Sequence, residues 1–154
     1  MKKSYAFTVI ELIFVIVVLG ILSAIALPKF GKTGTQARVA SGKADVAAIR
    51  SAILAERQKG VIKGQSGYIE NGTGTDADGN KQMDNGGLFG GVLTYAKQNS
   101  TSSGQWSATA GTGTYNYNID GVNVQFTYTP ADGKFTCTPG DATEAQKYCK
   151  QMIY

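Results

Sequence analysis

Three groups of residues in this sequence have side chains that could do chemistry. The first is Glu11, the only charged residue between Phe7 and Leu27. The others are a set of oxygen-bearing side chains and a pair of cysteines: Asp76, Asp78, Asn80 and Asp84, then Cys137 and Cys149. Carboxylates and amides of this kind bind calcium, and paired thiols form disulfides. The chain contains no histidine, so the commonest general base and metal ligand is absent.

The apolar run around Glu11 has the length of a membrane span. Residues 7–27 would form a helix roughly 31 Å long, close to the thickness of the hydrocarbon core of a bilayer. The competing interpretation is a cleavable secretory signal, because Ala24-Ile25-Ala26 resembles a cleavage site after a basic start. The run is longer than a usual signal core and Glu11 interrupts it, so we favour the membrane span.

A carboxylate inside such a helix carries a free-energy cost. Phe14 and Val15, three and four residues beyond Glu11, cannot pair with it. We therefore expect a partner from another chain, such as a free amino terminus. The pattern predicts a helix that leaves the lipid and packs against copies of itself.

The residues before and after Glu11 also resemble a known family. Lys2-Lys3, then Ala6, then the stretch Phe7-Thr8-Val9-Ile10-Glu11-Leu12-Ile13, resemble the prepilin signature of type IV pilins and type II secretion pseudopilins. The resemblance covers about the first 60 residues. It implies that a prepilin peptidase cuts between Ala6 and Phe7, that the Phe7 amine is methylated, and that Glu11 pairs with this amine on a neighbouring subunit. The family usually has glycine where this chain has Ala6.

Proline and glycine follow the apolar run. Pro28 predicts a kink, and Gly31 and Gly34 predict a loosened segment up to Thr35; the alternative is that the helix simply ends here. Helical periodicity returns over residues 36–59 and gives an apolar stripe suited to carry a sheet. A coiled coil is the weaker alternative, because the pattern lasts only about three heptads.

The second half of the chain predicts strands. Apolar residues alternate over residues 115–119 and 122–128, with Asp120-Gly121 as the turn between them. Residues 130–133 form the next turn and Phe135 begins a third strand. Residues 88–96 are expected to be a strand or a small helix. We therefore expect an α+β fold, in which a long N-terminal helix, apolar and then amphipathic, packs on a C-terminal antiparallel β-sheet as in pilins.

The two cysteines are separated by 11 residues, and a metal site there would lack further ligands. A Cys137–Cys149 disulfide would stabilise a small domain by roughly 3 kcal/mol and fits an oxidising compartment. The pairing also resembles the C-terminal disulfide loop of many type IV pilins. Free buried thiols are the alternative.

The loop that begins Asp76-Ala77-Asp78-Gly79-Asn80, followed by Asp84, places oxygen ligands at alternate positions. No cofactor is required, and calcium is the one that this loop would suit. Lys81 stands where an EF-hand loop has glycine, and Gly87 stands where it has the bidentate glutamate. A plain solvated turn is therefore the favoured alternative.

These interpretations divide the chain into a leader (1–6), a transmembrane and polymerisation helix (7–27), a kinked amphipathic helix (28–59) and a β-rich head (60–154). The family resemblance implies a non-enzymatic subunit of a type IV pilus or type II secretion pseudopilus, serving secretion, DNA uptake, adhesion or motility. Nucleic acid would be contacted only indirectly, in a DNA-uptake pilus.

The implied partners are other copies of the chain, the prepilin peptidase, and an inner-membrane platform with its ATPase. The implied location is the bacterial inner membrane, as a single-pass protein, and then a periplasmic or extracellular filament. The alternatives are a membrane-anchored or secreted β-rich ligand-binding module and, last, a calcium-dependent hydrolase.

Overall fold

The computed structural model of the protein describes residues 7–75, 80–109, 111–138, 140 and 143–154, with the backbone alone for residues 27–32. The chain divides into two compact units, residues 1–36 and 37–154, and each is described by itself. Helix α1 (Val9–Ile62) contributes to both units.

Helix α1 ends in a turn that glycine makes possible. Gly64 has a φ of 81°, a left-handed conformation that residues with a Cβ rarely adopt. Its N–H donates to the carbonyl of Val61 at 3.0 Å, and the N–H of Gln65 donates to the carbonyl of Gly60 at 2.9 Å. These two bonds form a Schellman motif, which satisfies the last carbonyls of the helix. The helix therefore ends three residues beyond Lys59, where the sequence placed its boundary.

The backbone of α1 remains helical through Pro28 and on to Thr35. The expected loosening of this segment is therefore wrong, and so is the alternative that the helix ends at Pro28. A proline removes one backbone hydrogen bond, and regular helix on both sides can propagate across that single gap. The kink at Pro28 stays a prediction.

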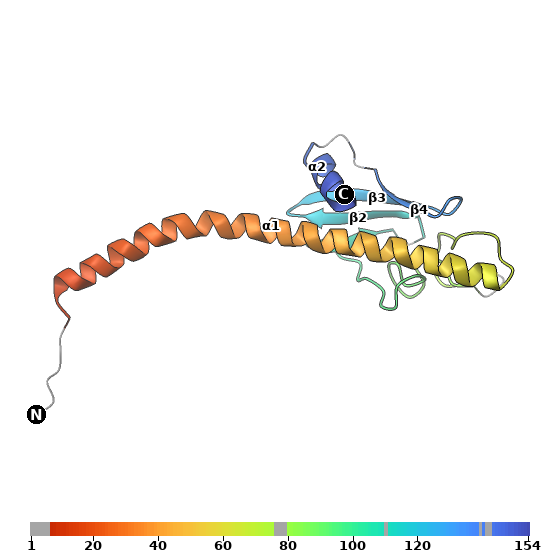
Figure 1. Cartoon of the computed structure of the whole chain (residues 1–154), viewed down its shortest axis with the longest axis horizontal. Coiled ribbons are helices and arrows are strands. Elements are labelled where there is room, and N and C mark those ends of the chain that lie inside the picture. The colour runs from red at the N-terminus through yellow and green to blue at the C-terminus, as the bar shows by residue number, and fades with distance from the viewer. Residues whose placement is uncertain (1–6, 76–79, 110, 139, 141–142) are drawn as a thin grey trace, which may run out of the picture. The chain divides into compact units, whose positions relative to one another are not determined.

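The second unit contains an antiparallel sheet (Figure 1). Its described strands pair in chain order: β1 (Trp106–Ala108), β2 (Thr114–Ile119), β3 (Val122–Thr129) and β4 (Lys134–Cys137). Asp120 and Gly121 have φ values of 51° and 88°, as a two-residue hairpin turn requires. The predicted hairpin and the strand beginning near Phe135 are confirmed. Strand β1 was not predicted from the sequence.

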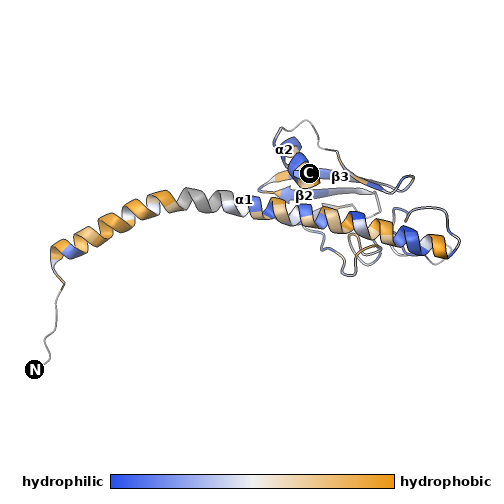
Figure 2. Ribbon diagram, viewed as in Figure 1, coloured by the Kyte–Doolittle hydropathy of each residue, from blue (hydrophilic) through white to orange (hydrophobic). Residues whose placement is uncertain are grey.

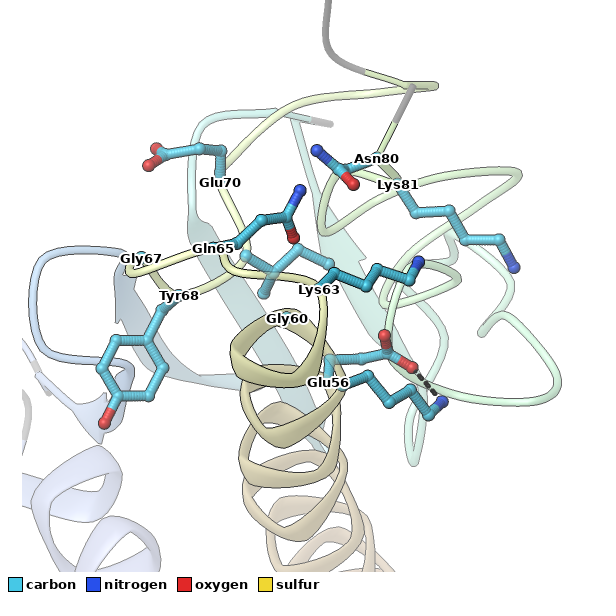
Figure 3. A pocket seen from close by; sticks show the side chains of 11 residues that line it. Glu56, Gly60, Lys63, Gln65, Gly67, Tyr68, Glu70, Asn80 and Lys81 are labelled. Carbon is cyan, nitrogen blue, oxygen red and sulfur yellow. Dashed lines mark hydrogen bonds and ion pairs between the residues drawn. The ribbon is translucent and has the colours of Figure 1, made fainter. Parts of the chain in front are cut away.

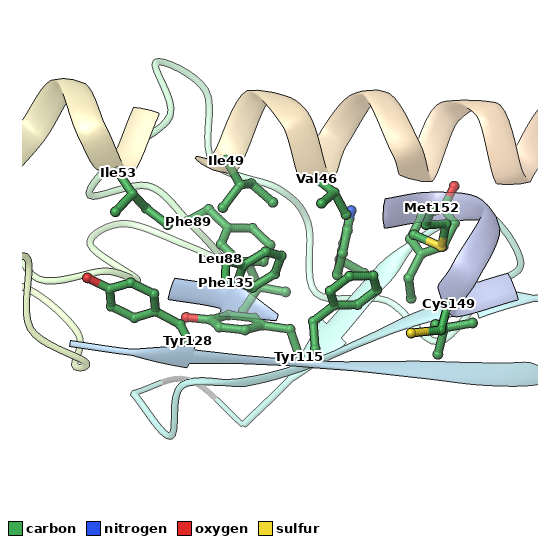
Figure 4. Close-up of a cluster of buried hydrophobic side chains, with 14 of the residues drawn as sticks. Val46, Ile49, Ile53, Leu88, Phe89, Tyr115, Tyr128, Phe135, Cys149 and Met152 are labelled. Atoms are coloured by element: carbon green, nitrogen blue, oxygen red, sulfur yellow. The ribbon is translucent and has the colours of Figure 1, made fainter. Parts of the chain in front are cut away.

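The core of this unit lies between α1 and one face of the sheet (Figure 4). Helix α1 supplies Val46, Ile49 and Ile53, each at most 1% exposed. The sheet supplies its alternate residues, and a loop adds Phe89, which packs against the rings of Trp106, Tyr115 and Phe135. The predicted α+β class, with a long helix on an antiparallel sheet, is confirmed.

A second helix, α2 (Thr143–Ile153), was not predicted. It buries Ala145, Cys149 and Met152, and Cys149 forms a disulfide with Cys137 of β4. The predicted disulfide is therefore confirmed and the free thiols are excluded. Gly42 lets α1 approach closely here, because a Cβ at this position would lie 2.6 Å from Cε of Met152 and 2.6 Å from Cε1 of Tyr117.

Residues 88–96 form neither the strand nor the small helix that the sequence predicted. They make turns, with an isolated bridge between Leu88 and Lys97. Leu88 and Phe89 nevertheless enter the core. Phe89 has a φ of 60°, a conformation that helices and strands do not contain.

Candidate functional site

The first eighteen residues of α1 form a segment long and apolar enough to cross a membrane. This segment is Val9–Ala26, and none of it is buried within the chain. Figure 2 shows the corresponding turns as almost uniformly hydrophobic, in contrast to the mixed second part of the helix. Phe7, just before the helix, is 80% exposed. A surface of this kind is stable only when lipid or other protein covers it.

Helix α1 begins with a reciprocal pair of side chains, Thr8 and Glu11. The Thr8 hydroxyl donates to Oε2 of Glu11 at 2.7 Å, and the backbone N–H of Thr8 donates to the same oxygen at 2.8 Å. The backbone N–H of Glu11 in turn donates to the Thr8 hydroxyl oxygen at 3.3 Å. This is a capping box, in which a threonine before the helix and a glutamate three residues later satisfy each other's donors.

The capping box corrects one expectation from the sequence. Phe14 and Val15, further along the helix, cannot pair with Glu11, and from them the sequence predicts a carboxylate without a local partner. Its partner lies three residues earlier, at Thr8. The signal was present as threonine, two intervening residues and glutamate just before an apolar run. The partner expected from another chain stays a prediction.

The two carboxylate oxygens of Glu11 differ in their hydrogen bonds. Both bonds from Thr8 reach Oε2, and Oε1 has no partner within the part of the chain that the structure describes. A carboxylate oxygen can accept two hydrogen bonds, so Oε1 can accept from an ammonium group.

Of the two residues at the expected processing site, Phe7 lies next to Thr8, and Ala6 lies outside the described residues. Pro28, the other expected assembly residue, lies within α1, and its side chain is outside the description.

A buried carboxylate, Asp84, organises the loops over the sheet. Asp84 is 2% exposed. Its Oδ1 accepts from the N–H of Phe89 and from the hydroxyl of Tyr115, both at 3.0 Å, and its Oδ2 accepts from the N–H of Gly111 at 2.9 Å. Asp84 thus ties two loops to β2. The bond to Phe89 also holds that residue in its left-handed conformation.

Asp45 of α1 makes a similar connection, which the sequence did not reveal. Its Oδ2 accepts from the indole N–H of Trp106 at 2.9 Å, and its Oδ1 accepts from the ammonium of Lys97 at 2.8 Å. Partners 52 and 61 residues away leave no local pattern that could identify it.

The candidate calcium ligands are only partly described. Asp76 and Asp78 lie outside the described residues, and Asn80 is half-buried beside a surface cavity. Both oxygens of Asp84 already accept protein hydrogen bonds, so we assign Asp84 to the core network. Among the described residues, no three histidine, cysteine or acidic side chains gather where they could hold a metal. The calcium site of Asp76, Asp78, Asn80 and Asp84 stays a prediction.

The cavity beside Asn80 lies at the C-terminal end of α1 and has a volume of about 540 Å³ (Figure 3). Its charged lining residues are of both signs: Glu56, Lys59, Lys63, Glu70 and Lys81. The Lys59 ammonium pairs with the Glu56 carboxylate across one turn of the helix. The cavity is therefore a polar surface hollow, without the apolar lining typical of small-molecule sites.

The head is expected to lose stability above about pH 10. Burial and the nearby Asp84 carboxylate raise the pKa of Tyr115, and burial and the nearby Glu70 carboxylate raise the pKa of Tyr128. Unfolded chains lose both phenol protons near pH 10 while the folded head keeps them. The free energy of unfolding should therefore be unaffected by these groups below pH 10 and should fall above it.

Urea unfolding between pH 8 and pH 12, followed by Trp106 fluorescence, measures this effect. The decline should be shallower in a Tyr115→Phe variant. A wild-type chain whose stability stays constant up to pH 12 would contradict the prediction.

Known proteins resemble this chain over part of its length. Residues 1–27 match the family model described as the prokaryotic N-terminal methylation motif. The chain is similar to the type IV narrow pilus major component PilA5 of Thermus thermophilus, with 46% identity over 61 residues. The match covers 38% of this chain and 53% of that protein, so the chain spans about half the length of the curated relative it matches. No solved structure matches the chain.

Proposed function

Because the chain belongs to the type IV pilin family, a family of non-enzymatic structural proteins, we propose that it polymerises into a type IV pilus through its N-terminal helix. One observation carries the proposal. The methylation motif of residues 1–27 leads directly into an 18-residue apolar helix, Val9–Ala26, that the chain itself leaves uncovered. In a filament, the same helix of other subunits covers this surface.

Processing and membrane insertion come first in this proposal. A prepilin peptidase cuts between Ala6 and Phe7, and the new amine of Phe7 is methylated. Removing six residues leaves the whole apolar run on the mature subunit, whereas a signal peptidase would remove it. Before assembly, the subunit therefore resides in the inner membrane as a single-pass protein, with its disulfide-bonded head in the periplasm.

Assembly then brings Glu11 beside the amine of another subunit. An ammonium group at the start of a neighbouring helix would neutralise the carboxylate in an environment without water, where an unpaired charge is costly. The chain carries no phosphate-binding loop in its sequence. We therefore assign the energy of assembly to a separate ATPase and platform in the inner membrane.

A pilus is favoured over a secretion pseudopilus. The curated relative is a pilus major component, and the head carries a C-terminal disulfide that links β4 to α2.

The mature amino terminus tests the proposal against its alternative, a secreted or membrane-anchored β-rich binding module. Mass spectrometry of the protein from producing cells should find N-methylated Phe7, and electron microscopy of sheared surface material should show filaments labelled by an antibody to the head. A mature chain that starts at Leu27 and remains monomeric in the medium would support the secreted module instead. An uncut chain starting at Met1 would show that Ala6 prevents processing.

A further inference from the structure

The hydrogen bonds between Thr8 and Glu11 fix the orientation of the Glu11 carboxylate as well as capping the helix. Two donors of Thr8, its hydroxyl and its backbone N–H, converge on a single carboxylate oxygen, Oε2, at 2.7 and 2.8 Å. A carboxylate held by one oxygen cannot rotate freely, so the direction of its other oxygen is fixed as well. Oε1 is that other oxygen, and among the described residues it has no partner.

We propose that Thr8 is a positioning residue for assembly: it holds Oε2 of Glu11 so that Oε1 is presented to the amine of a neighbouring subunit. This inference rests on the proposed function, since it concerns the contact that joins subunits. It assigns the two oxygens separate tasks. Oε2 binds within the subunit, and Oε1 binds between subunits.

The physical advantage of this arrangement is preorganisation. A free glutamate side chain samples many rotamers, and an intersubunit ion pair would have to select one of them at an entropic cost. The hydrogen bonds from Thr8 select the rotamer before the subunits meet. They also keep the carboxylate at the first turn of α1, where the partial positive charge of the helix N-terminus stabilises an anion.

The same bonds serve the subunit while it waits in the membrane. Glu11 there has no neighbour to neutralise it, and polar groups in hydrocarbon must find hydrogen bonds within the chain. Thr8 supplies two of them without consuming the oxygen that assembly needs. Because the cut falls before Phe7, processing leaves Thr8 and its backbone N–H intact.

Two variants of Thr8 test the inference in cells that make filaments. Thr8→Val has nearly the same shape but lacks the hydroxyl, and Thr8→Ser keeps it. We expect the Ser variant to assemble like the wild type. We expect the Val variant to reach the membrane at the wild-type level, with its share of subunits in sheared filaments reduced about fivefold, the effect of losing one helix-capping side chain.

A cross-linking measurement separates positioning from simple helix capping. An apolar carbodiimide condenses the Glu11 carboxylate with the Phe7 amine to an amide, and a bond between subunits gives a covalent dimer. Dimer formed per assembled subunit should fall in Thr8→Val and remain at the wild-type level in Thr8→Ser. An unchanged yield per assembled subunit in Thr8→Val would overturn the inference and leave Thr8 as a helix cap only.

The controls keep this test independent of the proposed function. If Thr8→Val assembles and cross-links like the wild type, the positioning role is wrong while the pilus proposal stands. If the wild type itself forms neither filaments nor covalent dimers, the proposed function fails first. Linked peptides identified by mass spectrometry must contain both Phe7 and Glu11, and a link found within single chains would overturn the inference.

Discussion

Replacing Glu11 by glutamine is expected to reduce filament assembly at least about a hundredfold, because in the proposed filament it would leave the amine of the neighbouring subunit buried without its counter-ion. Glutamine is the informative substitution. It is accepted at the third helical position of a capping box, so the bond from the Thr8 hydroxyl can persist while the negative charge is lost. The measurement is the ratio of subunit in sheared filaments to subunit in the inner membrane.

Two controls accompany the Glu11→Gln variant. Its membrane level should equal that of the wild type, since glutamine costs less than glutamate in hydrocarbon. Ser23→Ala changes another polar side chain of the same apolar run, keeps the carboxylate, and should assemble normally. If Glu11→Gln builds filaments at the wild-type level, charge pairing does not hold the subunits together, and apolar packing alone must do so.

The parts of the fold that follow a simple period could be predicted from the sequence. The apolar stripe in the second part of α1 has helical spacing, and the strands on either side of Asp120-Gly121 alternate strictly; the apolar run before the stripe was predicted from its length. The hairpin turn could be predicted as well, because an aspartate–glycine pair suits two successive positive φ values.

Helix α2 was missed because its signal is weak. It has eleven residues, and its buried face consists of Ala145, Cys149 and Met152, of which only Met152 is a large apolar residue. A helix this short has little stability of its own. It is held by the Cys137–Cys149 disulfide and by packing on the core, and neither contact is local in the sequence.

The candidate site was predicted in part, and the missing parts have different causes. The Thr8–Glu11 capping box is encoded in four consecutive residues, and the partner of Glu11 lies on its N-terminal side, whereas Phe14 and Val15 lie on its C-terminal side. Asp84 could not have been assigned in this way, because its partner Tyr115 is 31 residues away. In the sequence it stood among other oxygen-bearing side chains of a glycine-rich loop, which is the usual appearance of a surface residue.

Replacing Asp84 by alanine is expected to destabilise the head strongly. The substitution orphans three donors, the N–H groups of Phe89 and Gly111 and the hydroxyl of Tyr115, in a place where water has little access. Each unsatisfied buried donor costs about 1–3 kcal/mol, so three of them should lower the free energy of unfolding by about 3 kcal/mol or more. That is a large part of the roughly 5–15 kcal/mol by which a domain is usually stable.

Urea unfolding of the full chain in detergent micelles measures this loss, and the single tryptophan, Trp106, reports it from within the core. Asp132→Ala is the matched control, because that carboxylate pairs with Lys134 on an exposed turn, and its removal should shift the midpoint far less than Asp84→Ala does. The loss caused by Asp84→Ala should be smaller in a Tyr115→Phe background, where one donor is already absent. If Asp84→Ala unfolds at the same urea concentration as the wild type, the loops are held by their apolar side chains, and the carboxylate returns to consideration as a calcium ligand.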